Sequence, residues 1–130
     1  MPQTITRGCK TLVAEANARI ETVTVQEAQR RMADGALLVD LRDPRELERD
    51  GRLPGAFHCP RGMLEFWIDP ESPYHKPVFA EDRPFLFICG GGWRSALAAA
   101  TAQDMGLKPV AHVDGGFKAW KDAGGPVEAR

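Results

Sequence analysis

The sequence has few cysteines, almost no net charge and no long apolar run, and each of these shortages excludes a class of protein. Its three cysteines are an odd number without the spacing of a disulfide framework or a zinc site. A formal net charge of −1 gives no general attraction to nucleic acid or to a membrane surface. No apolar run approaches the roughly 20 residues of a membrane-spanning helix. We therefore expect no metal site and neither a nucleic-acid nor a membrane partner.

The N-terminus and the length indicate an ordinary single-domain protein. Residues 1–10 are polar, without the apolar centre of a secretory signal, and unpaired cysteines suit a reducing compartment, so a cytoplasmic location is expected. A chain of 130 residues is the size of one domain and buries roughly two thirds of its unfolded surface. Such a chain has room for a substantial core.

Short apolar runs alternate with helical patterns along most of the chain. Strands are expected in residues 20–23, 36–41, 53–58, 85–88 and 110–113. Helices are expected in residues 10–20, 25–34, 44–50, 62–68, 95–105 and 117–123. This alternation predicts a doubly wound α/β domain, with a central parallel sheet of about five strands flanked by helices.

The first helix stands apart from the alternating pattern. Residues 1–19 are interpreted as an N-terminal helical extension, and residues 20–130 as the main domain. Leu12, Val13, Ala16 and Ile20 share one face of this helix. That face would dock on the sheet domain or on a second copy of the chain, which would allow a homodimer.

The stretch from Phe85 to Ser95 carries the chemistry of the chain. Residues 85–88 form an apolar run without alternation, as in a strand buried on both faces, and an alanine-rich helix starts near Ser95. Cys89 therefore lies between a strand end and a helix start. In open α/β sheets, ligands bind at this edge.

Three features of the stretch favour the thiolate form of Cys89, whereas a free cysteine is mostly protonated at neutral pH. The start of the following helix presents unpaired N–H groups and partial positive charge. Arg94 adds a fixed cation. Gly90, Gly91 and Gly92 can turn their N–H groups inward around an anion. Together they predict a nucleophilic cysteine in an anion-binding loop; the alternative is a buried structural thiol.

The spacing of this loop resembles that of rhodanese-like sulfurtransferase domains, in which Gly, Arg and Ser follow the active cysteine at three, five and six residues. Here these positions are Gly92, Arg94 and Ser95. The resemblance implies that Cys89 takes a sulfane sulfur from a donor such as thiosulfate, holds it as a persulfide and passes it to cyanide or a thiol, without a cofactor. The residues that it places around donor and persulfide are Gly90, Gly91, Gly92, Trp93, Arg94 and Ser95.

Weaker signatures of the same family extend the resemblance over residues 20–127. They are an Asp-x-Arg pair at Asp40 and Arg42, a partial turn motif in residues 51–56, and a Gly-Gly-x-x-x-Trp ending in residues 115–120. Phe117 and Trp120 in the last are expected to be core residues.

Several residues outside the loop are candidates for the site. Asp40 and Arg42 are interpreted as a structural ion pair near the site, because buried charges are normally paired. A role for His58 as general base is less favoured, because the resemblance implies no histidine partner. In the Pro-rich residues 61–81, Arg61 and Glu65 would share a helix face as an exposed ion pair of little consequence, and the rest of the segment would be an ordered loop over the sheet. The functional alternative is that Arg61 assists the anion and that Phe66 or Trp67 walls the pocket.

Two other functions remain open beside sulfur transfer. One is a binding module that carries or senses persulfide with little turnover. The other is a cysteine phosphatase or arsenate reductase; tyrosine-type phosphatases place Arg six residues after Cys, whereas Arg94 follows Cys89 by five. Cys9 and Cys59 are predicted to be dispensable, unless Cys59 is a resolving thiol.

Overall fold

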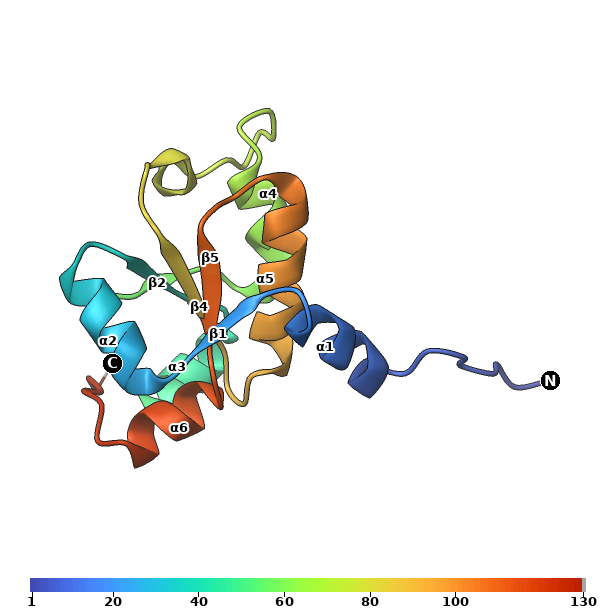
Figure 1. Ribbon diagram of the computed structural model, residues 1–130, viewed down its shortest axis with the longest axis horizontal. Coiled ribbons are helices and arrows are strands. Elements are labelled where there is room, and N and C mark those ends of the chain that lie inside the picture. The colour runs from blue at the N-terminus through green and yellow to red at the C-terminus, as the bar shows by residue number, and fades with distance from the viewer. Residues whose placement is uncertain (130) are drawn as a thin grey trace.

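The computed structural model, which describes residues 1–129, shows a parallel sheet between two layers of helices (Figure 1). The strands in this part of the chain lie in the order β1-β5-β4-β2-β3, and all neighbours pair in parallel. They are β1 (Glu21–Val23), β2 (Leu37–Asp40), β3 (Phe57–His58), β4 (Phe85–Ile88) and β5 (Val110–Val113). The predicted α/β fold with a five-stranded parallel sheet is confirmed.

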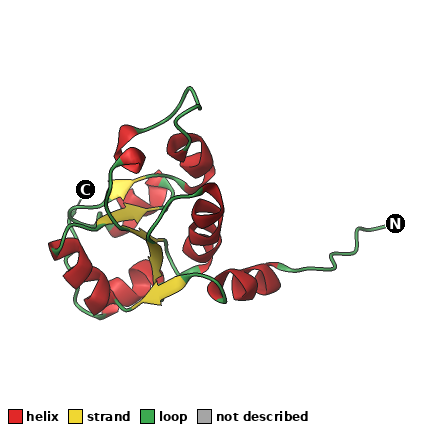
Figure 2. Cartoon of the chain, turned by 45° about the horizontal axis from the view of Figure 1, so that its top comes forward, coloured by secondary structure: helices red, strands yellow, loops and turns green. Residues whose placement is uncertain are grey.

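Helices lie on both sides of this sheet (Figure 2). The α-helices within residues 1–129 are α1 (Cys9–Asn17), α2 (Val25–Ala33), α3 (Pro44–Asp50), α4 (Leu64–Ile68), α5 (Trp93–Met105) and α6 (Gly116–Asp122). Two short 3₁₀ helices, η1 (Arg61–Met63) and η2 (Pro77–Ala80), belong to the Pro-rich segment. Across the described residues, no helix combines the length and the apolar character needed to cross a membrane.

The apolar run of β4 is explained by the two cores of the domain. Phe85 and Phe87 point to the face covered by α4 and α5, whereas Leu86 and Ile88 point to the face covered by α2 and α6. Since successive side chains of a strand alternate between faces, a strand buried on both sides needs apolar residues at every position. β4 pairs with β2 on one edge and β5 on the other, so it is the central strand.

Helix starts follow the signals in the sequence. The Asp43 carboxylate accepts the Arg45 N–H at 2.8 Å, and Glu46 Oε1 accepts the Asp43 N–H at 2.9 Å, which forms a capping box ahead of α3. Pro44 occupies the first helical position, where no N–H is needed. This box fixes the place of Glu46, which becomes important at the site.

The segment of residues 61–81 contains more helix than the sequence predicts. A helix was expected only in residues 62–68, but residues 77–80 form η2. Phe79 explains the difference: its ring is buried and lies 5.8 Å from the rings of both Phe57 and Phe85. This aromatic anchor holds the turn that begins at Pro77.

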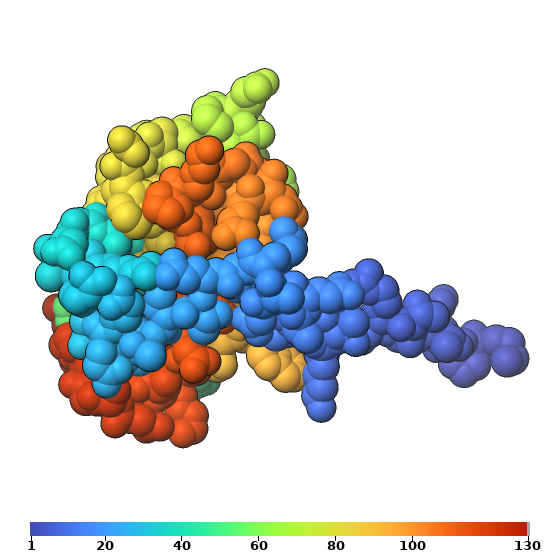
Figure 3. All heavy atoms as spheres, viewed as in Figure 1, coloured from blue at the N-terminus to red at the C-terminus, as the bar shows by residue number. Residues whose placement is uncertain are grey.

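The N-terminal helix α1 packs on α5 of the same chain. Val13 and Ala16 meet Ala96 and Ala100 in a small apolar cluster. Leu12, predicted to share this face, is 40% exposed, because the alanines of α5 offer only a narrow surface. The chain ahead of α1 projects away from the rest of the molecule (Figure 3). The homodimer through α1 stays a prediction.

The two-sided burial of β4 predicts a large effect of truncating its side chains. Phe87→Ala should lower the free energy of unfolding by about 3–5 kcal/mol, because it leaves a cavity in a core where Phe87 is fully buried. The matched control is Phe66→Ala, at a residue that is 52% exposed, which should change the value by less than about 0.5 kcal/mol. Urea unfolding measures both, and equal losses would contradict this packing.

Candidate active site

Cys89 lies directly after β4 and before α5, at the carboxyl edge of the sheet. Its Sγ accepts the N–H of Gly92 at 3.1 Å and the N–H of Ser95 at 3.3 Å. Both amides belong to the start of α5, where N–H groups have no partner within the helix. The sulfur therefore occupies an anion-binding position at a helix N-terminus, as the sequence predicts.

The loop is held in this shape from the side opposite the sulfur. The carbonyl of Cys89 accepts the Phe117 N–H at 2.7 Å, and that of Gly90 accepts the Lys118 N–H at 3.2 Å. This contact needs Gly116, where a Cβ would lie 2.5 Å from the Cys89 oxygen. Gly92 completes the turn with a φ of +108°, a value that L side chains rarely adopt. With their carbonyls bound to α6, the loop peptides are oriented so that Gly92 and Ser95 can donate to Sγ.

A cavity of about 270 Å³ opens above the sulfur. It is lined by Cys89, Gly91, Trp93 and Arg94. Only 1% of Cys89 is exposed, whereas about half of Trp93 is. The structure thus brings together these members of the predicted loop around one opening.

Arg94 is bound by a carboxylate that was not predicted to belong to the site. Its Nη1 and Nη2 donate to the two oxygens of Glu46 at 2.7 and 3.0 Å. The hydrogen bond from Arg94 is the main reason why the pKa of Glu46 lies below its usual value. The sequence identifies Arg94 as a fixed cation beside Cys89; the structure adds that this cation is paired with Glu46. Glu46 shows in the sequence only as a helix-cap residue.

Asp40 and Arg42 have the structural arrangement that the sequence favours. Both are buried, with Arg42 Nη2 donating to Asp40 Oδ2 at 2.8 Å and to the Gly51 carbonyl at 3.0 Å. The Arg42 guanidinium lies 4.1 Å from the centre of the Phe117 ring. The pair therefore connects the end of β2 to α6, the helix that supports the Cys89 loop.

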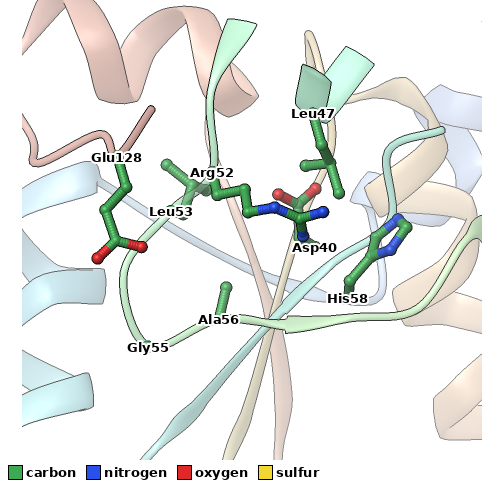
Figure 4. A pocket seen from close by; sticks show the side chains of 8 residues that line it. All are labelled: Asp40, Leu47, Arg52, Leu53, Gly55, Ala56, His58 and Glu128. Atoms are coloured by element: carbon green, nitrogen blue, oxygen red, sulfur yellow. The ribbon is translucent and has the colours of Figure 1, made fainter. Parts of the chain in front are cut away.

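His58 faces a different cavity from Cys89. Its Nε2 donates to the Arg42 carbonyl at 2.6 Å. Its ring lines a pocket of about 120 Å³ beside Asp40 and Arg52 (Figure 4), and Cys89 is not among the lining residues. This placement agrees with the sequence-based view that His58 is not the base for Cys89.

The three candidates from residues 61–81 do not line the Cys89 cavity. Arg61 pairs with Glu65 at 3.0 Å and faces a separate cavity beside α1 and α5. Trp67 packs edge-on against Phe57, and Phe66 points to solvent. The reason is that α4 is buried against the sheet face, which holds this segment away from the opening above Cys89.

The chain matches the profile of the rhodanese-like domain over residues 24–123, most of its length. The chain belongs to the rhodanese-like domain family. This match confirms the resemblance seen in the sequence and spans strands β2 to β5 and helices α2 to α6.

Solved structures of similar chains support the assignment. A protein of unknown function from Rhodopseudomonas palustris, described as a possible tyrosine phosphatase, is 65% identical, with 98% of this chain and 99% of that chain covered and a TM-score of 0.94. The polysulfide-sulfur transferase homodimer of Wolinella succinogenes is 28% identical over 93% and 87% of the two chains, with a TM-score of 0.72. A human single-domain sulfurtransferase is 26% identical over 78% and 95%, with a TM-score of 0.65. Rhodanese-family membership with such neighbours supports sulfur transfer at the level of the family.

Cys59 and Cys89 are both buried in the same core, but the sulfur of Cys59 faces the Pro60 carbonyl, whereas that of Cys89 accepts two backbone N–H groups. Burial raises the pKa of Cys59 to about 12. In the native protein at pH 8, iodoacetamide should therefore leave Cys59 unmodified, and Cys59 should react only after the protein unfolds. Peptide mass spectrometry measures this. Rapid labelling of Cys59 in the folded protein, or loss of Cys89 reactivity in a folded Cys59→Ala variant, would show that Cys59 takes part in the chemistry.

The Arg94–Glu46 pair predicts a pH-dependent contribution to stability. Because the pKa of Glu46 is lower in the folded chain than in the unfolded one, its carboxylate stabilises the fold above about 4.5, and this stabilisation is lost as pH falls through the folded value. Glu46→Gln should lower the free energy of unfolding by about 0.5–1 kcal/mol at pH 7, since the pair is partly exposed.

The difference in free energy of unfolding between the wild type and Glu46→Gln should shrink towards zero as the pH falls below the ordinary carboxyl pKa. Urea unfolding at neutral and acidic pH measures it, with Glu71→Gln in an exposed loop as the matched control. A difference that is the same at both pH values would mean that the charge of Glu46 does not stabilise the fold.

Proposed function

We propose that this protein is a sulfurtransferase in which Cys89 carries a sulfane sulfur as a persulfide. The observation that carries the proposal is the sulfur at the end of the central strand, accepting two backbone N–H groups at the base of an open cavity. Backbone donors in fixed positions stabilise a negative charge without reorganising during the reaction. A thiolate there is a ready nucleophile.

In the proposed first half-reaction, the Cys89 thiolate attacks the outer sulfur of thiosulfate. A bond forms between Sγ and that sulfur, the sulfur–sulfur bond of the donor breaks, and sulfite leaves with the electron pair. The enzyme keeps one additional sulfur atom as a persulfide anion. A guanidinium has five N–H donors, and Glu46 accepts only some of those of Arg94, so others can bind the anionic end of the donor.

In the proposed second half-reaction, an acceptor attacks the outer sulfur of the persulfide. With cyanide, thiocyanate leaves and the Cys89 thiolate is restored; with a thiolate acceptor, the product is the acceptor's persulfide. The two steps give ping-pong kinetics. The exposed ring of Trp93 at the edge of the cavity supports binding of an acceptor with an apolar part.

A phosphatase is the second candidate, because the relative from Rhodopseudomonas palustris is described as a possible tyrosine phosphatase. Release of an alcohol from a phosphoester is assisted by a general acid. The cavity lining, Cys89, Gly91, Trp93 and Arg94, holds no carboxyl or imidazole group. Nearby Glu46, with its pKa lowered by Arg94, is a poor proton donor at neutral pH. These features, with the short spacing from Cys89 to Arg94, favour sulfur transfer.

The proposal predicts sulfur uptake that depends on Cys89. After incubation with thiosulfate, the intact protein should gain the mass of one sulfur atom, and Cys89→Ser should gain none. Thiocyanate production from thiosulfate and cyanide should fall by about 100-fold in Arg94→Ala, since a charged donor to the anion is removed. Arg30→Ala, on the exposed face of α2, is the matched control and should keep full activity.

The same assays separate the other functions. Hydrolysis of a phosphoester by wild type without uptake of sulfur would establish the phosphatase instead. A persulfide that forms on Cys89 but passes to neither cyanide nor a thiol would identify a persulfide carrier with little turnover.

A further inference from the structure

A buried histidine lies behind the Cys89 loop and takes no part in the reaction as described so far. His112 belongs to β5 and is 3% exposed. Its Nδ1 lies 2.9 Å from Ser95 Oγ. Its Nε2 lies 3.0 Å from Asn17 Oδ1 and 3.1 Å from Thr22 Oγ1. Both ring nitrogens are therefore engaged, each by a different part of the fold.

These partners determine which nitrogen of His112 carries the proton. The Asn17 oxygen can only accept, so Nε2 carries a hydrogen and donates to it. In the neutral ring, Nδ1 then has a free electron pair directed at the Ser95 hydroxyl. Burial lowers the pKa of His112, and the Asp114 carboxylate partly offsets this effect. While the Cys89 thiol keeps its proton, the ring is neutral and able to accept one.

Ser95 connects this ring to the nucleophile. Its backbone N–H donates to Cys89 Sγ at 3.3 Å, and its hydroxyl oxygen lies 3.5 Å from the same sulfur. In the protonated state the Cys89 thiol donates to Ser95 Oγ. The Ser95 hydroxyl lies 2.9 Å from His112 Nδ1 and 3.3 Å from the Gly92 carbonyl, and it donates to the nearer acceptor, His112 Nδ1. The three groups form a continuous chain of hydrogen bonds from the sulfur to a base.

We propose that His112 is a positioning residue that accepts the proton of the Cys89 thiol through Ser95. The thiol proton moves to Ser95 Oγ while the hydroxyl proton moves to His112 Nδ1. Ser95 stays neutral, the sulfur becomes a thiolate, and the ring becomes an imidazolium. The net charge of the group does not change, and Ser95 then donates to the thiolate.

The surroundings of His112 are suited to holding this positive charge. The titratable groups that act on the ring are Asp114 at the end of β5 and, through Ser95, Cys89. Asn17 of α1 and Thr22 of β1 face the ring from the other elements and are uncharged. In a site of low dielectric, the thiolate itself stabilises the imidazolium strongly.

A second cavity gives the ring its own access to solvent. It has a volume of about 250 Å³ and is lined by Asn17, Thr22, His112 and Asp114 together with the loop residues Gly91–Trp93. Cys89 lines the other cavity and is absent from the lining of this one. A proton can therefore be exchanged behind the loop while the sulfur donor occupies the front. Asn17 also makes α1 part of this arrangement.

This inference rests on the proposed function only in taking Cys89 as the nucleophile, and its test needs no sulfur donor. The measurement is the rate of Cys89 alkylation by iodoacetamide as a function of pH, because only the thiolate reacts. The variants are His112→Asn, Ser95→Ala and the double variant. Asn keeps an oxygen that can accept from Ser95 but is not a base. His75→Asn is the matched control, at a half-buried histidine of the Pro-rich segment whose Nδ1 lies 3.0 Å from the Trp67 carbonyl.

Each single variant should move the alkylation profile to higher pH and slow the reaction at pH 7 by about tenfold, the factor given by one pH unit. The double variant should be no slower than either single variant, because both remove the same chain of groups. A His112→Asn profile that follows wild type would overturn the proposal, as would additive losses in the double variant.

A second measurement keeps the test valid if a variant does not fold. Nitrogen-15 NMR of the His112 ring in the wild type should show Nδ1 protonated over the pH range in which Cys89 is a thiolate. In Cys89→Ser, where no thiolate forms, the ring should be neutral at the same pH. Identical spectra of this ring in both proteins would overturn the proposal, whereas failure of sulfur uptake alone would overturn only the proposed function.

Discussion

Two backbone N–H groups meet at one sulfur atom, and most of the fold serves to hold them there. The sulfur follows β4, the strand with a partner on each edge, so its position is fixed by the centre of the sheet. The amides belong to α5, which is buried along one face of that sheet. The loop between them is held by its carbonyls, which accept hydrogen bonds from the start of α6. A shift in any of these three elements would misalign the donors.

Charge around the loop is arranged in pairs. Arg94 is bound by Glu46 in a partly exposed pair, and Arg42 is bound by Asp40 in a buried pair. A cation that already has a carboxylate partner gives a thiolate less net attraction than a free one. The oriented N–H groups of Gly92 and Ser95, which keep their direction, therefore matter more for a negative charge on the sulfur than the paired Arg94 does. Arg94 remains available to an anionic donor through the N–H groups that Glu46 does not use.

Local signals made the strand, the loop and the helix starts predictable. The apolar run of residues 85–88, the glycines after Cys89 and the Asp43-Pro44 start of α3 each act over a few residues, and each forms as expected. Two residues that complete the site were not predictable in this way. Glu46 lies 48 positions before Arg94, and its role depends on β2 and β4 being neighbours.

The second of these residues is His112, which the sequence places in an apolar strand. Its link to Ser95 exists because β5 pairs with β4 and α5 packs across both. Arg61, Phe66 and Trp67 show the reverse case. They were candidates for the pocket because they are cationic or aromatic, but they do not line it. Their direction is set by the burial of α4, which depends on tertiary packing and leaves no local signal.

The start of α5 also offers hydrogen-bond donors for the negative charge that moves during the proposed reaction. Gly92 and Ser95 donate to the resting sulfur, while Trp93 and Arg94 between them supply the first two N–H groups of the helix, which have no partner within it. When a persulfide forms, the negative charge moves outward by one sulfur atom. Trp93 and Arg94 line the cavity into which the outer sulfur would extend. One helix terminus thus supplies donors for the Cys89 sulfur and for the proposed persulfide, without a change in the fold between the two half-reactions.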